Sequence, residues 1–137
     1  MLYLEVITPQ GSVLSVPVEE VTAPGIEGEF QVLPAHLPAL VILGGGRLSY
    51  TSKGEAGSLF LRGGVIEVTQ GEEDPSQGRV LILAEETQLP DQLNTERAQA
   101  LKEAATAELS SGSYLSESRY NRVRQDLGFA EAVLAAA

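Results

Sequence analysis

Three side chains with acid–base or metal-binding chemistry lie close together in the sequence: Glu27, Glu29 and His36, the one histidine of the chain. A general base needs a nucleophile or an orienting acid within reach, and a zinc site needs three or four imidazole, thiolate or carboxylate ligands. One histidine and no cysteine do not provide such a ligand set. Pro34 and Pro38 flank His36 and predict a stiff turn that presents its side chain. The stretch therefore favours a contact loop over a catalytic site, and no metal site is expected.

Glu27 and Glu29 could also be read as a catalytic carboxylate pair. Residues two apart in a strand point to the same face, but nothing beside them would raise the pKa of one carboxyl and not the other, as acid–base catalysis requires. We interpret them as the solvated edge of a loop. No G-x-S-x-G, H-E-x-x-H or G-x-x-x-x-G-K-[ST] pattern occurs in the chain. A small hydrolase that pairs His36 with a nearby serine is the remaining enzymatic alternative.

Two further groups of residues could bind an anion. The triple glycine at 44–46 could cradle a phosphate, but no predicted helix follows it, so a turn is the better interpretation. Arg119, Arg122 and Arg124 crowd one segment near the C-terminus. They are read either as a solvated helix face or as an anion-binding set, since guanidinium groups suit phosphates. The acidic residues 72–74 are interpreted as a solvated hairpin loop.

Charge and composition limit the classes of function. The 137 residues carry a formal net charge of −10 and a pI near 4.4, so a nucleic-acid partner, which requires a basic face, is not expected. Without cysteine there is neither a disulfide framework nor thiolate chemistry. The N-terminus has no signal-peptide pattern, and no window reaches the roughly 18 apolar residues of a membrane span. These features predict a soluble, cytoplasmic protein.

Short apolar runs separated by glycine and proline fill the first part of the chain. This spacing is typical of an antiparallel sandwich or barrel, and we expect a β-sandwich domain of about ten short antiparallel strands over residues 1–88. Pro17 within its run predicts an edge strand, because proline cannot donate to a ladder. The expected turns lie at Thr8–Gly11, Ala23–Gly25, 44–46, Lys53–Gly54 and Gly63–Gly64.

Residues 89–137 change to a helical period and predict an antiparallel helical hairpin as a second domain. After Pro90 the segment is rich in helix formers, the run 110–113 (SSGS) breaks it, and Ser116 is a plausible N-cap of the second helix. The expected contact stripes are small, so the hairpin should lean on the sandwich or on a partner. They comprise Ala98, Leu101, Ala105 and Leu109 in the first helix and Tyr120, Val123, Leu127, Ala130 and Leu134 in the second.

Taken together, several short motifs resemble a known family. They are TPQG at 8–11, APGIEGEFQVLPAHLPAL at 23–40, the glycine pair at 63–64 and VLILAEE at 80–86. The central block is specific, and the chain resembles the epsilon subunit of bacterial F-type ATP synthases, called delta in mitochondria. Because that family also ends in a helical hairpin, the resemblance covers nearly the whole chain.

The resemblance implies a non-catalytic subunit of the central stalk, with no cofactor. Such a subunit clasps the gamma subunit and rests on the ring of c subunits, with Glu27, Glu29 and His36 on the c-ring contact surface. Its hairpin can extend toward the alpha/beta catalytic head and block hydrolysis. The resemblance also places the chain at the cytoplasmic face of the bacterial plasma membrane, attached only through the complex. A free-standing β-sandwich binding module with a helical tail is the alternative.

Some members of that family bind ATP in the hairpin through an Ile/Leu-Asp-x-x-Arg-Ala motif helped by arginines of the second helix. The matching segment here is 93–98, with Asn94 in place of the aspartate and with Arg97 retained; Arg122 and Arg124 would assist. Because the amide lacks the charge of the carboxylate, we expect ATP to bind weakly or not at all, as a regulatory ligand at most.

Overall fold

Eight strands and two helices make up the chain, and the computed structural model describes all residues from Met1 to Ala137. The strands are β1 (Leu2–Thr8), β2 (Gly11–Val18), β3 (Glu20–Gly25), β4 (Gly28–Val32), β5 (Ala39–Ile42), β6 (Gly45–Ser52), β7 (Glu55–Thr69) and β8 (Arg79–Gln88). The helices are α1 (Thr95–Ser110) and α2 (Glu117–Ala136). Strands thus occupy the first part of the chain and helices the second, as the two periodicities predicted.

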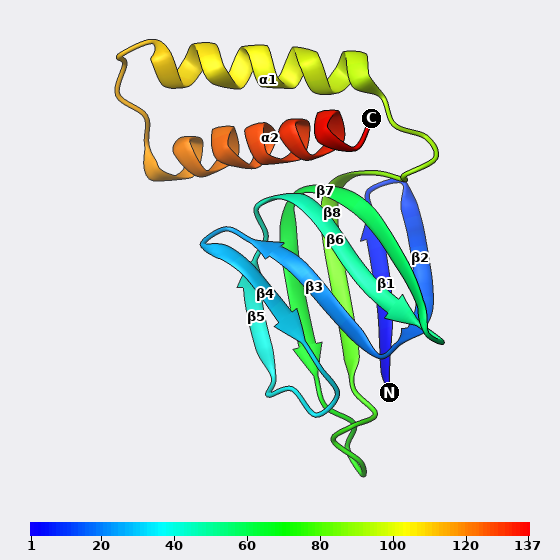
Figure 1. Ribbon diagram of the computed structural model, residues 1–137. Coiled ribbons are helices and arrows are strands. Elements are labelled where there is room, and N and C mark those ends of the chain that lie inside the picture. Colours follow the sequence, from blue (N-terminus) through cyan, green and yellow to red (C-terminus); the bar gives the residue numbers. More distant parts are fainter.

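The strands form one sheet that folds over into two layers. Its order is β2-β1-β8-β7-β6-β3-β4, with β5 paired to β7 off this path. In Figure 1, β3, β4 and β6 lie in front of β1, β7 and β8. All pairs are antiparallel except β1 with β8, which run parallel. Pro17 lies in the edge strand β2, as its missing N–H predicted. The β-sandwich fold class is therefore confirmed, with one parallel pair.

The long strand β7 is one reason why the sheet has fewer strands than the ten or so expected. Gly63 and Gly64 were expected to form a turn between two strands, but both lie inside β7. Residues before them pair with β6 and residues after them pair with β5. Both glycines have positive φ, 71° and 115°, a conformation that side chains other than glycine rarely adopt. The glycine pair bends one continuous strand from one layer into the other.

The expected turn at Ala23–Gly25 is also a strand in the structure. These residues form the end of β3 and pair with β4, with Pro24 opposite Glu29. On its other side β3 pairs with β6 only from Glu20 to Thr22. Because that ladder has already ended, the missing N–H of Pro24 breaks no hydrogen bond there. The proline and glycine at this position therefore suggested a turn although the residues form a strand.

The sandwich core lies between the two layers. It contains 16 buried hydrophobic residues drawn from β1 to β4 and β6 to β8 and from the residue that follows β5. Burial alternates along these strands. In β1, for example, every second residue from Leu2 is buried and the residues between are more exposed, which is what a two-layer packing requires. Its members are Leu2, Leu4, Val6, Val18, Val21, Ala23, Val32, Leu43, Leu48, Leu59, Leu61, Ile66, Val68, Val80, Ile82 and Ala84.

The helices α1 and α2 form a hairpin over one end of the sandwich, and α2 lies between α1 and the strands (Figure 1). Both begin with a capped turn: the side-chain oxygen of Asn94 accepts from the N–H of Arg97, and that of Ser116 accepts from the N–H of Arg119. The predicted cap at Ser116 is thus observed. Neither helix combines the length and the apolar character needed to cross a membrane.

The buried face of α2 differs from the expected stripe. Val123 and Ala130 are buried as expected, but Tyr120 is exposed, and the buried set also includes Gln125, Phe129 and Val133. The reason is that α2 contacts two neighbours, α1 and the sandwich, so no single helical stripe describes it. A separate hairpin core results, made of Phe60, Ala98, Phe129, Ala130 and Val133. The division into domains 1–88 and 89–137 stays a prediction.

Candidate functional site

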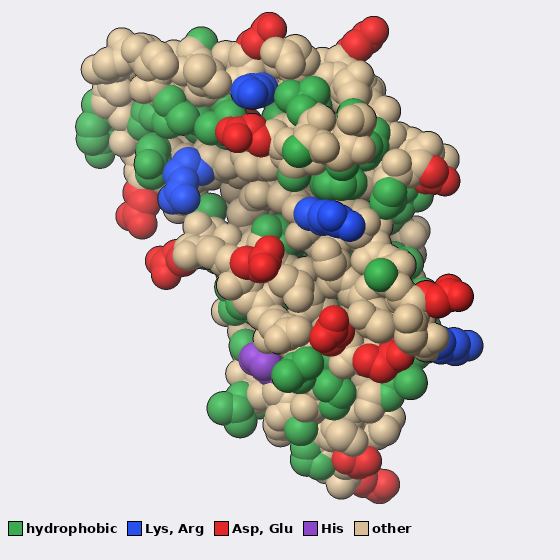
Figure 2. Space-filling model, in the orientation of Figure 1, with side chains coloured by type: hydrophobic (Ala, Val, Ile, Leu, Met, Phe, Trp, Pro, Cys, Tyr) green, Lys and Arg blue, Asp and Glu red, His purple; other side chains and the backbone are tan.

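Glu27, Glu29 and His36 line a single groove between β4 and β5. The groove has a volume of about 600 Å³. Both glutamates are exposed and His36 is half-buried. In Figure 2 the histidine lies near the lower left edge beside hydrophobic side chains. The remaining lining residues are Gly25, Ile26, Gly28, Phe30, Leu40, Val41 and Ile42. The structure therefore brings together the three residues that the sequence predicted for one contact surface.

A tight turn positions the two glutamates. Gly25 pairs with Gly28 at the end of the β3–β4 ladder, so only Ile26 and Glu27 connect the strands. A Cβ on Gly25 would lie 2.7 Å from the backbone oxygen of Gly28, and Gly28 has a φ of 137°. Glycine is therefore needed at both positions, and the turn holds Glu27 and Glu29 on a stiff rim.

The ring of His36 has a backbone group as its one hydrogen-bond partner. Its N–H donates to the carbonyl of Leu33 at 3.0 Å, and its ring Nδ1 lies 2.6 Å from the carbonyl of Leu37. Because a carbonyl can only accept, Nδ1 carries a proton, and Nε2 has no hydrogen-bond partner within the chain. The side chain of Gln70 donates to the carbonyls of Ala35 and His36. No serine or carboxylate is hydrogen-bonded to the ring, so the nucleophile and orienting acid of a hydrolase are not in place.

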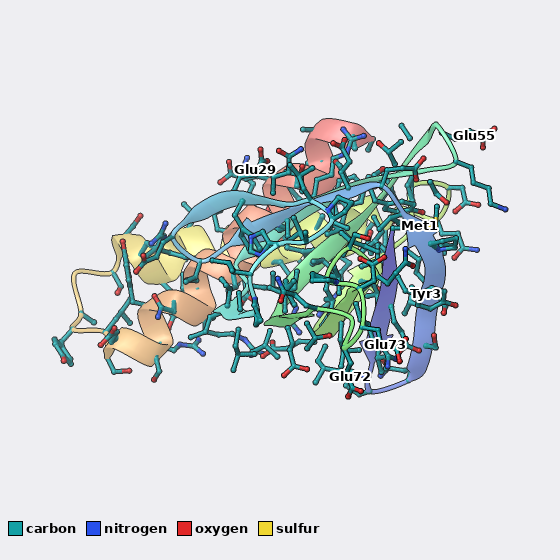
Figure 3. All side chains as sticks on the ribbon, turned by 90° about the horizontal axis from the view of Figure 1, so that it is seen from below. Met1, Tyr3, Glu29, Glu55, Glu72 and Glu73 are labelled. Atoms are coloured by element: carbon teal, nitrogen blue, oxygen red, sulfur yellow. The ribbon has the colours of Figure 1, made fainter.

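Other acidic residues do not extend this groove. Viewed from below, Glu29 lies at one edge of the sandwich while Glu72 and Glu73 lie on the β7–β8 loop at another (Figure 3). That loop is exposed, and Asp74 accepts from the N–H and hydroxyl of Ser76, which lowers the pKa of its carboxyl. No group of three metal-binding side chains lies close enough to hold an ion.

An exposed apolar row crosses the outer face of the sheet next to the groove. Ile42, Val65, Leu83 and Ile7 are successive partners across β5, β7, β8 and β1. Leu83 is 46% exposed and Ile42 is 55% exposed, and Leu40, two residues before Ile42 on the same face, is 70% exposed. Large apolar side chains gathered on one face mark a binding surface more often than a solvated one.

Sequence reasoning missed this apolar row, although a signal was present. Strands with one solvated face should alternate apolar and polar residues. In RVLILAE and in the end of LYLEVIT the residues on both faces of the strand are apolar. One face is buried in the core, and the other leaves Leu83 exposed and Ile7 half-buried. Two-sided apolar strands at the surface of a small sandwich would have pointed to a partner.

The residues predicted for nucleotide binding are engaged elsewhere. Asn94 caps α1, accepting from Arg97 at 2.9 Å, and its own N–H donates to the side chain of Gln88 at 2.8 Å. Arg97 forms two hydrogen bonds with Glu86, at 2.7 and 3.1 Å. Arg122 pairs with Glu85 at 2.6 Å. Arg124 stands apart from these pairs, with its guanidinium carbon 5.7 Å from the centre of the Tyr120 ring.

These pairs belong to one ionic network that joins the hairpin to the sandwich. Its centre is Arg62 of β7, whose side chain is only 13% exposed and which contacts Glu86 and Asp126 at 3.0 Å each. Hydrogen bonds from Arg97, opposed by burial and helped by Arg62, hold the pKa of Glu86 below its usual range. The same contact raises the pKa of Arg97. The sequence did not reveal this network, because its members are far apart along the chain.

Comparison with known proteins follows this geometry. A family model described as ATP synthase, Delta/Epsilon chain, beta-sandwich domain matches residues 1–90. The ATP synthase epsilon chain of Nitratidesulfovibrio vulgaris is 40% identical over 108 residues, covering 79% of this chain and 75% of that protein. The ATP synthase epsilon chain of Geobacter sulfurreducens is 39% identical over 108 residues, covering 79% and 73%. The resemblance found in the motifs is thereby confirmed.

Two solved structures share the fold along almost the whole chain. One is a chain of the Euglena gracilis mitochondrial ATP synthase, from a structure of its OSCP/F1/c-ring, with a TM-score of 0.70, 24% identity and coverage of 97% of this chain and 79% of that one. The other is from the central stalk and c-ring of the Tetrahymena thermophila enzyme, with a TM-score of 0.57, 12% identity and coverage of 98% and 95%. At these identities the likeness concerns the fold. On the family model and the curated relatives, the chain belongs to the delta/epsilon family of ATP synthase, as one of the epsilon chains, the non-catalytic subunits of its central stalk.

Proposed function

We propose that this subunit works in the rotor of the F-type ATP synthase by binding the gamma subunit and resting on the ring of c subunits. Rotation of the ring would then reach the catalytic head through a stalk that this chain helps to hold together. The exposed apolar row carries the proposal, because Leu40, Ile42 and Leu83 remain in water in the isolated chain. Burying such side chains against a partner is favourable by about 25 cal/mol per Å².

The gamma subunit is the partner that we assign to the apolar row. The row lies on the outer face of the sheet, and acidic side chains border it. The register of β5, β7, β8 and β1 puts Glu67 and Glu5 in the next row. An apolar centre with a polar rim is the usual composition of a protein interface. Because the row spans four strands, it fits a broad protein surface better than a single peptide strand.

The c ring is the partner that we assign to the groove. Glu27 and Glu29 project from a stiff turn, and the Nε2 of His36 has no partner within the chain. These groups suit a polar surface with donors or positive charge. Leu40 and Ile42 belong to both the groove and the apolar row, so the two contact surfaces adjoin and one subunit can contact both partners. The chain would then sit at the cytoplasmic face of the bacterial plasma membrane, attached only through the complex.

For the hairpin we propose a regulatory role that does not depend on tight nucleotide binding. Release toward the alpha/beta catalytic head would let it hinder ATP hydrolysis. ATP would have to displace Glu86 from Arg97 and Glu85 from Arg122, and Asn94 already serves as a helix cap. We therefore expect calorimetric titration with ATP to give weak binding or none. Micromolar binding that Arg97→Ala abolishes would contradict this expectation.

Co-purification tests the assignment of the partners. The chain is produced together with the gamma subunit of the same organism, as wild type, as Leu83→Glu and as the control Leu109→Glu. Leu83 lies in the apolar row, whereas Leu109 is an exposed leucine of α1. We expect gamma to be retained by the wild type and by the control and lost with Leu83→Glu. A wild-type chain that stays monomeric beside gamma would instead favour a free-standing binding module.

A further inference from the structure

Three glycines make room for α2 on the sandwich. A Cβ on Gly45 would overlap the backbone oxygen of Gln125, and a Cβ on Gly128 would overlap the backbone oxygen of Gly45. A Cβ on Gly63 would lie 3.1 Å from the side-chain oxygen of Gln125. At Gly45 and Gly128, therefore, the backbone of the helix rests on the backbone of the sheet with no side chain between them.

The close approach is what requires glycine at these two positions. Neither Gly45 nor Gly128 has a positive φ, so other residues could adopt either backbone conformation. Gly128 also lies inside α2, where glycine is a poor helix former compared with alanine. The helix on its own would gain from an alanine at this position. Its contact with Gly45 is the feature of the structure that an alanine would destroy.

The contacts around the glycine pair cannot easily adapt to a shift of the helix. The side chain of Gln125 donates to the backbone oxygen of Leu43 at 2.8 Å in a buried position. Phe60 is the one residue of the sandwich in the hairpin core, and Arg62 reaches Asp126 at 3.0 Å. A methyl group at Gly45 or Gly128 would push the helix away from a backbone, which has no rotamer to change. The hydrogen bond and the ion pair would then be lost together.

The hairpin has contacts of its own that do not involve the sandwich. Ala98 of α1 packs with Ala130 and other residues of α2 in the hairpin core. Arg119 of α2 forms two hydrogen bonds with Glu108 of α1, at 2.6 and 2.7 Å. These contacts would persist if α2 left the sheet. Loss of docking is therefore not the same event as loss of helix.

From these contacts we infer that the hairpin has one seated position, fixed by the backbone contact between Gly45 and Gly128, and that blocking this contact releases it as an intact pair of helices. The device is steric and all-or-none. Ionic contacts stabilise this seated position of α2 on the sandwich, and the close approach of Gly45 and Gly128 determines whether α2 can reach it.

The test compares two substitutions in α2 of the full chain. Gly128→Ala blocks the contact and raises helix propensity, whereas Asn121→Ala raises helix propensity at a half-buried position that makes no side-chain hydrogen bond. Because the chain lacks cysteine, spin labels can be placed at Glu67→Cys on the sandwich and Glu103→Cys on α1, both exposed sites. Pulsed electron paramagnetic resonance measures the distance between the two labels, and circular dichroism measures the helix content.

We expect one narrow distance for the unsubstituted chain and for Asn121→Ala. Gly128→Ala should lose that distance in favour of a longer, broad distribution, with helix content unchanged and with cooperative melting of the sandwich retained. Gly45→Ala should give the same result from the other side of the contact. Retention of the narrow distance in Gly128→Ala would overturn the inference. Loss of helix content in that variant would also overturn it, because the pair would then not leave intact.

Discussion

The sandwich and the hairpin are stabilised in different ways. Sixteen buried hydrophobic residues form the sandwich core, whereas five form the hairpin core, and only Phe60 among those five belongs to the sheet. Buried apolar area is the main favourable term in folding. The sandwich can therefore stand on its own core, while the hairpin depends on its attachment.

That attachment adds polar contacts to the packing of Phe60 and to the backbone contact between Gly45 and Gly128. Arg62, Glu86 and Asp126 form its centre, and Gln125 adds a buried hydrogen bond. Polar contacts of this kind contribute less net stability than an equal number of buried apolar groups, because water competes for them. They are directional, however, and define one orientation. This molecule therefore has one part suited to carry load and an attached part suited to be moved.

The largest expected effect on stability comes from a substitution in the sandwich core, and the matching substitution in the hairpin core should leave the sandwich unaffected. Leu48→Ala removes a fully buried side chain of the sandwich core and should lower the free energy of unfolding of the sandwich by about 2–5 kcal/mol. Phe129→Ala in the hairpin core should loosen the helices and leave the unfolding midpoint of the sandwich nearly unchanged. Denaturant unfolding measures both when helical ellipticity follows the hairpin and tyrosine fluorescence follows the sandwich, in a chain carrying Tyr114→Phe and Tyr120→Phe so that only Tyr3 and Tyr50 report. Equal effects on one shared transition would show that the two parts fold as a unit.

A smaller effect is expected from the ionic network. Arg62→Met removes hydrogen bonds to Glu86 and Asp126 and should lower the opening free energy of α2 by about 1–3 kcal/mol. Native-state hydrogen exchange of the α2 amides measures this opening, with the core strands as internal reference. Glu108→Gln, which breaks an exposed pair inside the hairpin, should not change docking. An equal loss of protection in the sheet and the helix would show that the ionic network stabilises the whole chain and not the docking of α2 alone.

Acid pH should weaken docking through Glu86. Its pKa is lowered from the usual value of 4.5, chiefly by hydrogen bonds from Arg97, so its stabilising contribution is complete above pH 4.5 and is lost as pH falls through the lowered pKa. Protection of the α1 amides should therefore fall between pH 4.5 and more acidic values. Glu86→Gln should remove most of that pH dependence. The Glu108 carboxyl also has a lowered pKa, but it joins α1 to α2 and leaves docking unaffected.

The smallest effect on stability is expected at the groove. His36→Ala removes a half-buried side chain whose hydrogen bond goes to a neighbouring carbonyl, so the free energy of unfolding should change by no more than about 0.5 kcal/mol. The coupling of ion flow to ATP synthesis in membranes should nevertheless fall measurably, because we place His36 on the c-ring contact. Glu29→Ala should behave in the same way. A loss of several kcal/mol on His36→Ala would make the side chain a structural one.

Local patterns predicted the fold well where one neighbour decides the outcome. Alternation in LYLEVIT and the edge position of Pro17 follow from the pleat and from the missing N–H. Gly63 and Pro24 were misread, because the partner strands on each side decide whether a glycine pair or a proline ends a strand. Those partners come from distant parts of the chain.

In the candidate site, too, the features formed by one short segment were predicted and those formed by distant segments were not. Glu27, Glu29 and His36 lie on one short segment, and the structure gathers them in one groove. The arginines of the second helix were read either as a solvated face or as an anion-binding set, but Arg122 pairs with Glu85 of β8, and Arg97 of the first helix pairs with Glu86. A charge pattern in one helix cannot indicate its ion-pair partners on another element. The apolar row was missed because its members come from four strands.

The most direct test of the account asks whether the sandwich alone folds and binds. A chain that ends at Pro90 retains β8 and Leu89, which packs against the sandwich core, and it lacks the hairpin. It is produced with the gamma subunit beside the full chain, and both are purified and melted. We predict cooperative melting of the shortened chain and retention of gamma by both forms. A shortened chain that aggregates, or that folds but no longer retains gamma, would contradict the claim that the sandwich carries the rotor contacts.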